Sequence, residues 1–426
     1  MEYDGECPMQ DNIHNVVRTL EWKMTLRQWV KPMFLILLLS GGALFLEYRV
    51  WMSYQPPLVS SSPQKLDEPL LPVYVPEPVA VRAHENESRW PILPPPPAPN
   101  MDLLKKKGCV ADGLLNEYGG DERSSAAMIN RSQCYYLHRS LETWLDPPDF
   151  EKAYRVRKEI TKPNTVYGMF IAEALDTKAN YEYPMENRDF DFKKMCRDGS
   201  RNFWGEHTCK PSLESAEYRK YLEYITERAM DLGVQVFLFG QVFYQDAADL
   251  HRTRMPEVIA SMREYAEFRG MKIFIGAQTN DIQDEAYLRQ FDFIEGGVGI
   301  DDTGALEEGS CLSRWWKKPG DWCWALLWHQ DYASKANNVL VHLDWSGKIG
   351  DDMGRFVRMD KVDREKTLER LHRFFTEKKI GFLMPVMARL SRDNGGCYGG
   401  DKHFYSASRK YSCGDEDVIN RILGGK

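Results

Sequence analysis

The 426-residue sequence lacks several signatures that would assign its chemistry directly. No G-x-G-x-x-G or P-loop follows an apolar segment, which argues against nucleotide binding by an open sheet. No CxxC pair occurs, which argues against a zinc ribbon or a thioredoxin motif. The net charge is -7 and no basic stripe carries interleaved aromatic residues, so we do not expect nucleic-acid binding. The histidines show no i,i+4 pairing, and we predict neither a metal site nor a cofactor.

Long apolar runs are also scarce, and none reaches the ~20 residues of a full membrane span without its flanks. Residues 33–46 are apolar and uncharged, and residues 47–52 extend them. No A-x-A cleavage site follows, and the polar lead is long for a signal peptide. We therefore interpret 33–52 as an uncleaved single-pass transmembrane anchor. Because more Lys and Arg precede it than follow it, residues 1–32 are predicted to be a cytoplasmic tail. The remainder would lie at the cell surface or in the lumen of the secretory pathway.

Proline is concentrated in one segment. Residues 55–100 hold 13 of the 23 prolines. Such a segment favours an extended polyproline spacer over a helix or an interior strand. We predict a disordered stalk over 53–104 and a folded domain over 105–426, for which the 43% of hydrophobic residues provide a sizeable core. A ligand for a proline-reading module is the alternative interpretation of the stalk.

Cysteine usage agrees with an extracytoplasmic domain. Eight of the nine cysteines follow the predicted anchor, and an even number there predicts up to four disulfides. We expect neighbours along the chain to pair. Two sequons, at Asn86 and Asn130, add the expectation of a glycoprotein. The eight cysteines are Cys109, Cys134, Cys196, Cys209, Cys311, Cys323, Cys397 and Cys413.

Apolar strand-like segments alternate with helical patterns in the second half of the chain. Strands are predicted over 167–175, 234–241, 271–278, 291–295, 338–347 and 380–386, with 109–114 and 322–328 as further candidates. Helices are predicted over 131–160 in two pieces, 213–232, 256–269, 282–289, 367–378 and 416–423. This alternation predicts an α/β fold with a parallel sheet. We favour a (β/α)8-type, TIM-like barrel, regular or irregular, over an open doubly wound sheet.

Five of the predicted strands end in a polar residue just before a loop. Alternation along each strand places these residues on one inward face, at the end where barrel enzymes build their active sites. They are Glu173, Gln241, Gln278, Glu295 and Asp344. Carboxylates placed in this way can act as general acid, general base or nucleophile. Buried salt bridges are the structural alternative for the carboxylates.

We predict Glu295 as one catalytic carboxylate, with Glu173 or Asp344 as its partner. Amide and imidazole groups at the same strand ends can hydrogen-bond sugar hydroxyls, and aromatic residues in the loops can stack on sugar rings. The predicted substrate-binding residues are Gln241, Gln278, His342, Trp345, Trp315, Trp316 and Tyr398. Packing around the disulfides is the alternative role for the tryptophans.

Two further acidic groups are candidates for a hard cation. Asp301-Asp302 and Asp351-Asp352 offer oxygen ligands, although loop acids are more often solvated. The sequence from Asp189 to Asp191 resembles the D-x-D of glycosyltransferases that use nucleotide sugars, but it does not follow a strand.

With its strand-end acids and tryptophan-rich loops, the domain resembles the barrel of glycoside hydrolases in the broad sense, over roughly 165–426. No family-specific motif is matched. The resemblance implies a membrane-anchored extracytoplasmic glycosidase that acts on a carbohydrate. The alternatives are a glycosyltransferase of type II topology, and a non-catalytic barrel that binds glycan or protein. The sequence does not indicate the oligomeric state.

Overall fold

The computed structural model describes nine segments of the chain: 92–116, 122–246, 253–280, 282–306, 326–345, 351–390, 394–397, 403–409 and 413–425. The predicted tail, the predicted anchor and most of the predicted stalk lie outside them. So do Cys311, Cys323, Trp315, Trp316 and Tyr398. Among the helices in the described segments, none combines the length and the apolar character that crossing a membrane requires.

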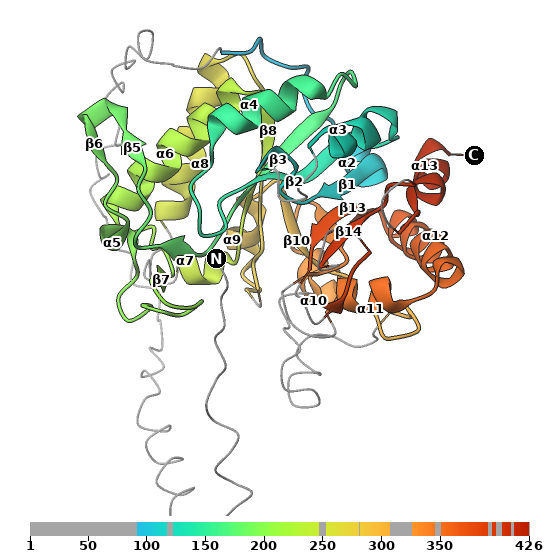
Figure 1. Ribbon diagram of the computed structural model, residues 1–426. Coiled ribbons are helices and arrows are strands. Elements are labelled where there is room, and N and C mark those ends of the chain that lie inside the picture. Colours follow the sequence, from blue (N-terminus) through green and yellow to red (C-terminus); the bar gives the residue numbers. More distant parts are fainter. Residues whose placement is uncertain are drawn as a thin grey trace, which may run out of the picture. The chain divides into compact units, whose positions relative to one another are not determined.

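A curled, mostly parallel sheet forms the centre of the domain (Figure 1). Seven strands pair in parallel, each with the next in this order. They are β1 (Gly108–Ala111), β2 (Tyr136–Glu142), β3 (Val166–Ile171), β8 (Val234–Phe239), β9 (Phe274–Ala277), β10 (Phe293–Gly297) and β11 (Val339–His342).

Residues 381–389 complete the pairing of strands around the sheet. β12 (Gly381–Phe382) pairs in parallel with β11, and β13 (Met384–Arg389) pairs in parallel with β1. Between them, the Leu383 amide donates to the Val341 carbonyl, 2.8 Å away. The ladder of hydrogen bonds therefore returns to its first strand through a single continuous segment. β14 (Phe404–Ser406) adds an antiparallel strand beside β13.

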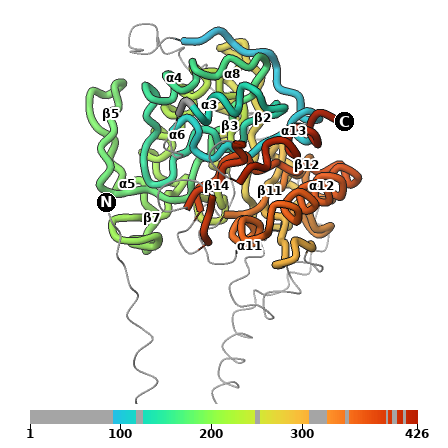
Figure 2. Tube along the Cα trace, turned by 45° about the vertical axis from the view of Figure 1, so that its right-hand side comes forward, coloured from blue at the N-terminus to red at the C-terminus, as the bar shows by residue number. Residues whose placement is uncertain are grey.

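The helices lie around the outside of this sheet (Figures 1 and 2). They are α2 (Met101–Lys107), α3 (Glu122–Arg131), α4 (Phe150–Glu159), α5 (Phe192–Met195), α6 (Ala216–Asp231), α7 (Val242–Gln245), α8 (Arg254–Phe268), α9 (Glu285–Arg289), α10 (Gln330–Ala333), α11 (Asp352–Arg358), α12 (Lys361–Glu377) and α13 (Glu416–Gly424). Local sequence sets their ends. The Ser215 side chain caps α6 by accepting the Tyr218 amide at 3.2 Å, and Gly233 follows the helix at a φ of 83°.

Apolar side chains fill two regions. The larger core lies between the strands and the outer helices. A smaller cluster fills the inside of the curled sheet; it includes Val110, Tyr136, Val166, Phe170, Val236, Leu238, Phe293, Leu340 and Leu383. This interior is tightly packed, because a Cβ added at Gly276 would lie 2.3 Å from the Phe293 ring. The inside of the sheet is therefore a filled core that supports the strand ends.

The six predicted strands are present, and the candidate at 109–114 is confirmed as β1. The helix predicted over 131–160 is correct only in its second piece, which is α4. Its first piece is wrong, because residues 136–142 form β2. The sequence of β2, YLHRSLE, lacks the continuous apolar run of a buried strand, because several of its polar side chains are buried at the site described below. This mixture of polar and apolar residues led to the prediction of a helix. Of the candidate strand at 322–328, the described residues 326–328 form a turn.

The predicted inward faces of two strands are also wrong. In β3, Met169 and Ile171 face the outer core, and Phe170 faces the interior. β8 shows the same reversal, with Leu238 inside. β3 is apolar on both faces and β8 is apolar apart from Gln235, so their sequences give little signal that fixes the phase.

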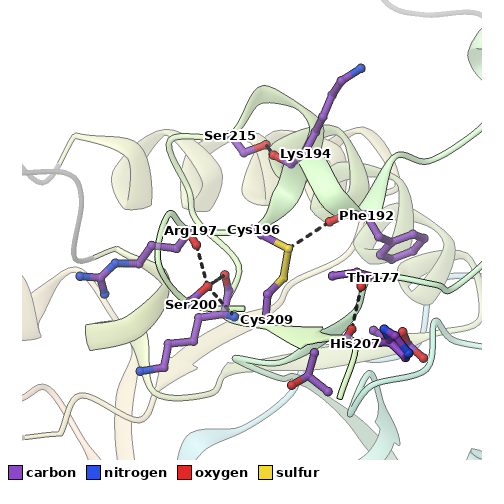
Figure 3. Close-up of a disulfide and its surroundings, with 12 residues drawn as sticks. Thr177, Phe192, Lys194, Cys196, Arg197, Ser200, His207, Cys209 and Ser215 are labelled. Carbon is purple, nitrogen blue, oxygen red and sulfur yellow. Dashed lines mark hydrogen bonds between the residues drawn. A yellow bond between two sulfur atoms is a disulfide. The ribbon is translucent and has the colours of Figure 1, made fainter. Parts of the chain in front are cut away.

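Three neighbouring cysteine pairs form disulfides, as expected: Cys109–Cys134, Cys196–Cys209 and Cys397–Cys413. The second lies in the long segment between β3 and α6 (Figure 3). Short strands fold this segment back on itself: β4 (Leu175–Asp176) pairs with β7 (Thr208–Cys209), and β5 (Glu182–Tyr183) pairs with β6 (Arg188–Asp189). Two turns of 3-10 helix also occur, η2 (Leu114–Asn116) and η3 (Pro184–Glu186).

The end of the predicted stalk contacts the domain. The Leu93 amide donates to the Asp231 carbonyl at 2.9 Å, and the Gln235 side chain donates to the Pro97 carbonyl at 2.9 Å. Leu104, in the middle of α2, is fully buried. Residues 92–104 therefore belong to the surface of the domain rather than to the predicted stalk. The sequon at Asn130 also lies on the domain, and its side-chain amide donates to the Glu159 carbonyl at 2.8 Å.

Candidate active site

Glu295, near the centre of β10, is fully buried among polar side chains. Its Oε1 lies 3.0 Å from His342 Nε2 and accepts a hydrogen bond from Gln278 Nε2 at 3.2 Å. Its Oε2 lies 3.1 Å from His138 Nε2. The structure thus brings together three residues predicted from the sequence (Glu295, Gln278 and His342) and one that was not, His138.

The two imidazoles set the charge of Glu295. Burial alone raises the pKa of this carboxyl, but the charges of His138 and His342 outweigh it and hold the pKa below its usual range. Burial lowers the pKa of His138. Burial opposes the charged form of His342 as well, yet the neighbouring Glu295 raises its pKa overall. The carboxylate is therefore kept ionised inside the sheet.

Sequence reasoning missed His138 because it lies on β2, which resembled a helix. Between β2 and β10 come β3, β8 and β9 in the sheet, so the contact between His138 and Glu295 crosses the inside of the curl. A spacing rule along one element cannot detect such a pair. The charged Arg139 between His138 and Ser140 also interrupts any alternation of polar and apolar residues along β2.

A second polar group surrounds Glu173, which follows β3. The Gln241 side chain donates to Glu173 Oε1, and Asn280 Nδ2 donates to Gln241 Oε1 at 3.3 Å. Glu173 is 2% exposed, and burial raises its pKa, although hydrogen bonds and nearby cations oppose the shift. A Cβ at Gly240 would lie 2.3 Å from Glu173 Oε2, so the absence of a side chain there makes room for the carboxylate.

Arg139 connects the three predicted carboxylates. Its charge acts on the pKa of Glu173 and of Asp344, and Glu295 in turn raises the pKa of Arg139. The guanidinium stacks at 3.8 Å on the Phe170 ring and at 4.5 Å on the Trp345 ring, and it forms an ion pair with Glu142. Arg139 is therefore coupled electrostatically to all three carboxylates, which lie in β10 and just after β3 and β11.

Asp344 follows β11 and is half-buried, so it is the most accessible of the three. Burial raises the pKa of Asp344 to about 6, and the charges of Asp352 and Glu295 add to the effect of burial while His342 and Arg139 oppose it. Asp352 fixes the surrounding backbone, because its carboxylate accepts the amides of Gly299, Ile300 and Asp344 at 3.0–3.2 Å. Asp352 is thus structural.

Aromatic residues lie next to this end of the sheet. The Trp345 ring centre is 4.7 Å from that of His342. In the loop braced by Cys196–Cys209, Phe203 is 49% exposed and contacts Trp204. Lys210 Nζ lies 3.3 Å from the centre of the Phe203 ring, and the charge of Lys210 reaches Glu173. Phe203 is therefore an exposed aromatic residue of this loop, and Trp345 is partly buried beside His342.

Three of the acids considered for a hard cation are engaged in turns and caps. Asp191 caps α5, and Asp351 caps α11 by accepting the Gly354 amide at 2.7 Å. Asp301 Oδ1 accepts two backbone amides in its own turn, from Thr303 and Ala305. Asp302 is exposed.

No family model matches the chain, and no curated protein matches it either. Solved structures that resemble it include glycoside hydrolases, in agreement with the resemblance predicted from the sequence. A GH113 β-1,4-mannanase is 11% identical, and the match covers 75% of this chain and 99% of that chain with a TM-score of 0.42. A GH27 β-L-arabinopyranosidase from Geobacillus stearothermophilus is 11% identical over 69% of this chain and 72% of that chain, with a TM-score of 0.39.

A D-allulose 3-epimerase from a Methylomonas species also matches, with 13% identity over 66% of this chain and 84% of that chain and a TM-score of 0.33. At these low identities and TM-scores the similarity carries no argument about activity. The arrangement of side chains must therefore support any function on its own.

Proposed function

We propose that this protein is a glycoside hydrolase built on a (β/α)8 barrel, with its active site at the carboxyl ends of the strands. The observation that carries the proposal is that Glu173, Glu295 and Asp344 lie in or just after three parallel strands of one curled sheet and are all coupled electrostatically to Arg139. Paired carboxylates are the usual catalytic groups for cleaving a glycosidic bond. The aromatic surface at Phe203 and Trp345 provides faces on which sugar rings can stack.

The accessibility of the carboxylates supports a division of roles. Asp344 is the group that a substrate can reach, and we assign it as the proton donor to the glycosidic oxygen. Glu173 is the second carboxylate, held by Gln241. Glu295 was the leading catalytic candidate in the sequence, but its enclosure by His138, His342 and Gln278 favours a supporting role.

The full-length chain should release sugar from at least one member of a panel of oligosaccharides with differing residues and linkages. On that substrate, Glu173→Gln should lower kcat by about 100-fold or more, because the amide has the size of the carboxylate without its charge. Glu206→Gln is the matched control, since its side chain is 75% exposed in the same segment. Equal rates for Glu173→Gln and Glu206→Gln would remove Glu173 from the mechanism.

We propose in addition that residues 33–52 anchor the protein and that the domain is extracytoplasmic. The apolar segment and its basic flank support this topology, as do the disulfides of the domain. In intact membrane vesicles, protease added from the cytoplasmic side should remove only residues 1–32 and leave the domain protected. Release of the protein by alkaline extraction would contradict an anchor.

A further inference from the structure

His138, Glu295 and His342 form a cluster to which the proposed hydrolysis assigns no chemical step. They come from β2, β10 and β11, and all three side chains are at most 1% exposed. Each offers one ligand atom, and these atoms all lie within 4.8 Å of one another. Elements distant in the sequence thus place two nitrogens and a carboxylate at one buried point.

The hydrogen atom on His342 is fixed by its neighbour. His342 Nδ1 lies 3.1 Å from the Leu343 carbonyl oxygen, which can only accept, so Nδ1 carries the hydrogen. Nε2 of a neutral ring then presents a lone pair to Glu295 Oε1 at 3.0 Å. Two lone pairs at that distance repel, and a positive species between or beside them relieves the repulsion.

A proton on His342 Nε2 would form a hydrogen bond with Glu295 Oε1 but would not reach the other carboxylate oxygen. His138 Nε2 and Glu295 Oε2 are both buried, and within the described segments neither has a hydrogen-bond partner. They lie 3.1 Å apart, which is too close for a bridging water. Burial of polar atoms that lack hydrogen bonds is unfavourable, so the pair calls for a ligand.

We propose that His138, Glu295 and His342 bind a divalent first-row transition-metal ion, with Zn²⁺ as the representative ion. Two imidazoles and one carboxylate are a common donor set for such ions. With metal–ligand bonds of about 2.0–2.2 Å, neighbouring ligand atoms lie roughly 2.8–3.1 Å apart at right angles and roughly 3.3–3.6 Å apart at the tetrahedral angle. The two separations between imidazole nitrogen and carboxylate oxygen, 3.0 Å to Oε1 and 3.1 Å to Oε2 of Glu295, fall in the first of these ranges.

The groups behind the three ligands are those that orient metal ligands in proteins. The Leu343 carbonyl holds the His342 tautomer, and the Tyr136 hydroxyl lies 3.0 Å from His138 Nδ1. The Gln278 amide binds the carboxylate. Such contacts behind a ligand fix the ring orientation and leave the coordinating atom free for the metal. An ion bound here would join β2 to β10 and β11 across the inside of the sheet.

Zinc uptake by the full-length chain tests the proposal. The protein is stripped with a chelator, dialysed against Zn²⁺, and analysed for metal by mass spectrometry. We expect about one equivalent per chain in the wild type and in the control His372→Ala, whose ring lies on α12, 3.5 Å from the Lys106 carbonyl oxygen. The double variant His138→Ala/His342→Ala should lose that equivalent. The double variant keeps every cysteine, so any metal bound to thiols is present in the wild type and in the double variant alike and does not affect the difference between them.

A measurement on the wild type alone guards against variants that misfold. Stripped wild-type protein loaded with Co²⁺ should develop visible absorption bands that Zn²⁺ displaces. Wild-type protein without such bands, or with no more zinc than the double variant, overturns the proposal. Uptake is measured without any glycan, so a failure here is distinct from a failure to hydrolyse oligosaccharides.

Discussion

Asp344→Asn leaves the chain folded and lowers the rate of glycoside hydrolysis by about 100- to 10,000-fold, the range expected when a positioned proton donor is lost. Asp344 is the predicted carboxyl with the greatest accessibility, and the neighbouring Asp352 holds its backbone amide at 3.2 Å. The asparagine keeps this amide contact and the size of the side chain. Turnover of a responsive oligosaccharide, compared at saturating concentration, is the measurement.

Asp302→Asn is the control for this variant. Its side chain is 86% exposed, and it belongs to the acid pair considered for a hard cation. Unchanged activity in Asp302→Asn together with a collapse in Asp344→Asn supports the hydrolase and also weighs against a glycosyltransferase that needs a cation at Asp301-Asp302. The reverse pattern would favour the glycosyltransferase.

Arg139→Met should lower the free energy of unfolding by about 3–5 kcal/mol, because it leaves a buried acid without its partner. The Arg139 side chain is 12% exposed and that of its ion-pair partner, Glu142, is 3% exposed. The methionine can still cover the Phe170 and Trp345 rings, so the loss isolates the charge. Urea denaturation followed by fluorescence measures the change.

The second substitution in this experiment removes the orphaned acid. Arg139→Met/Glu142→Gln should recover more than half of the stability that Arg139→Met loses, since the buried acid that pairs directly with Arg139 is then removed as well. A loss below about 1 kcal/mol in the single variant would show that the ion pair is not essential to the sheet. If Arg139→Met loses stability and the double variant does not recover it, the loss is due to the other carboxylates that are coupled to Arg139.

The acids of the site could be predicted because they end apolar strands. Glu295 follows an apolar run and precedes two glycines, and Asp344 follows VLVHL, so position alone marks both. Glu173 was found by the same rule even though the inward phase of its strand was wrong. Its placement depends on the backbone after Ile171, where the strict alternation of β3 has ended.

His138 and Arg139 could not be predicted in the same way. Their strand, β2, buries polar side chains, so its pattern lacks the apolar run that marked the other strands. Arg139 also has a φ of 52°, which breaks the regular alternation within β2. The meeting of His138 with Glu295 depends on the curl of the whole sheet, and no local pattern contains that information.

The central claim is that water cleaves a glycosidic bond at the strand-end carboxylates. Its most direct test is incorporation of ¹⁸O when the full-length chain acts on an oligosaccharide in H₂¹⁸O, with products analysed promptly by mass spectrometry. Hydrolysis breaks the bond between the anomeric carbon and the bridging oxygen, so the label should appear at the new reducing end of the released sugar. Asp344→Asn should show almost none. Release of unlabelled sugar, or equal labelling by the wild type and Asp344→Asn, would contradict the account.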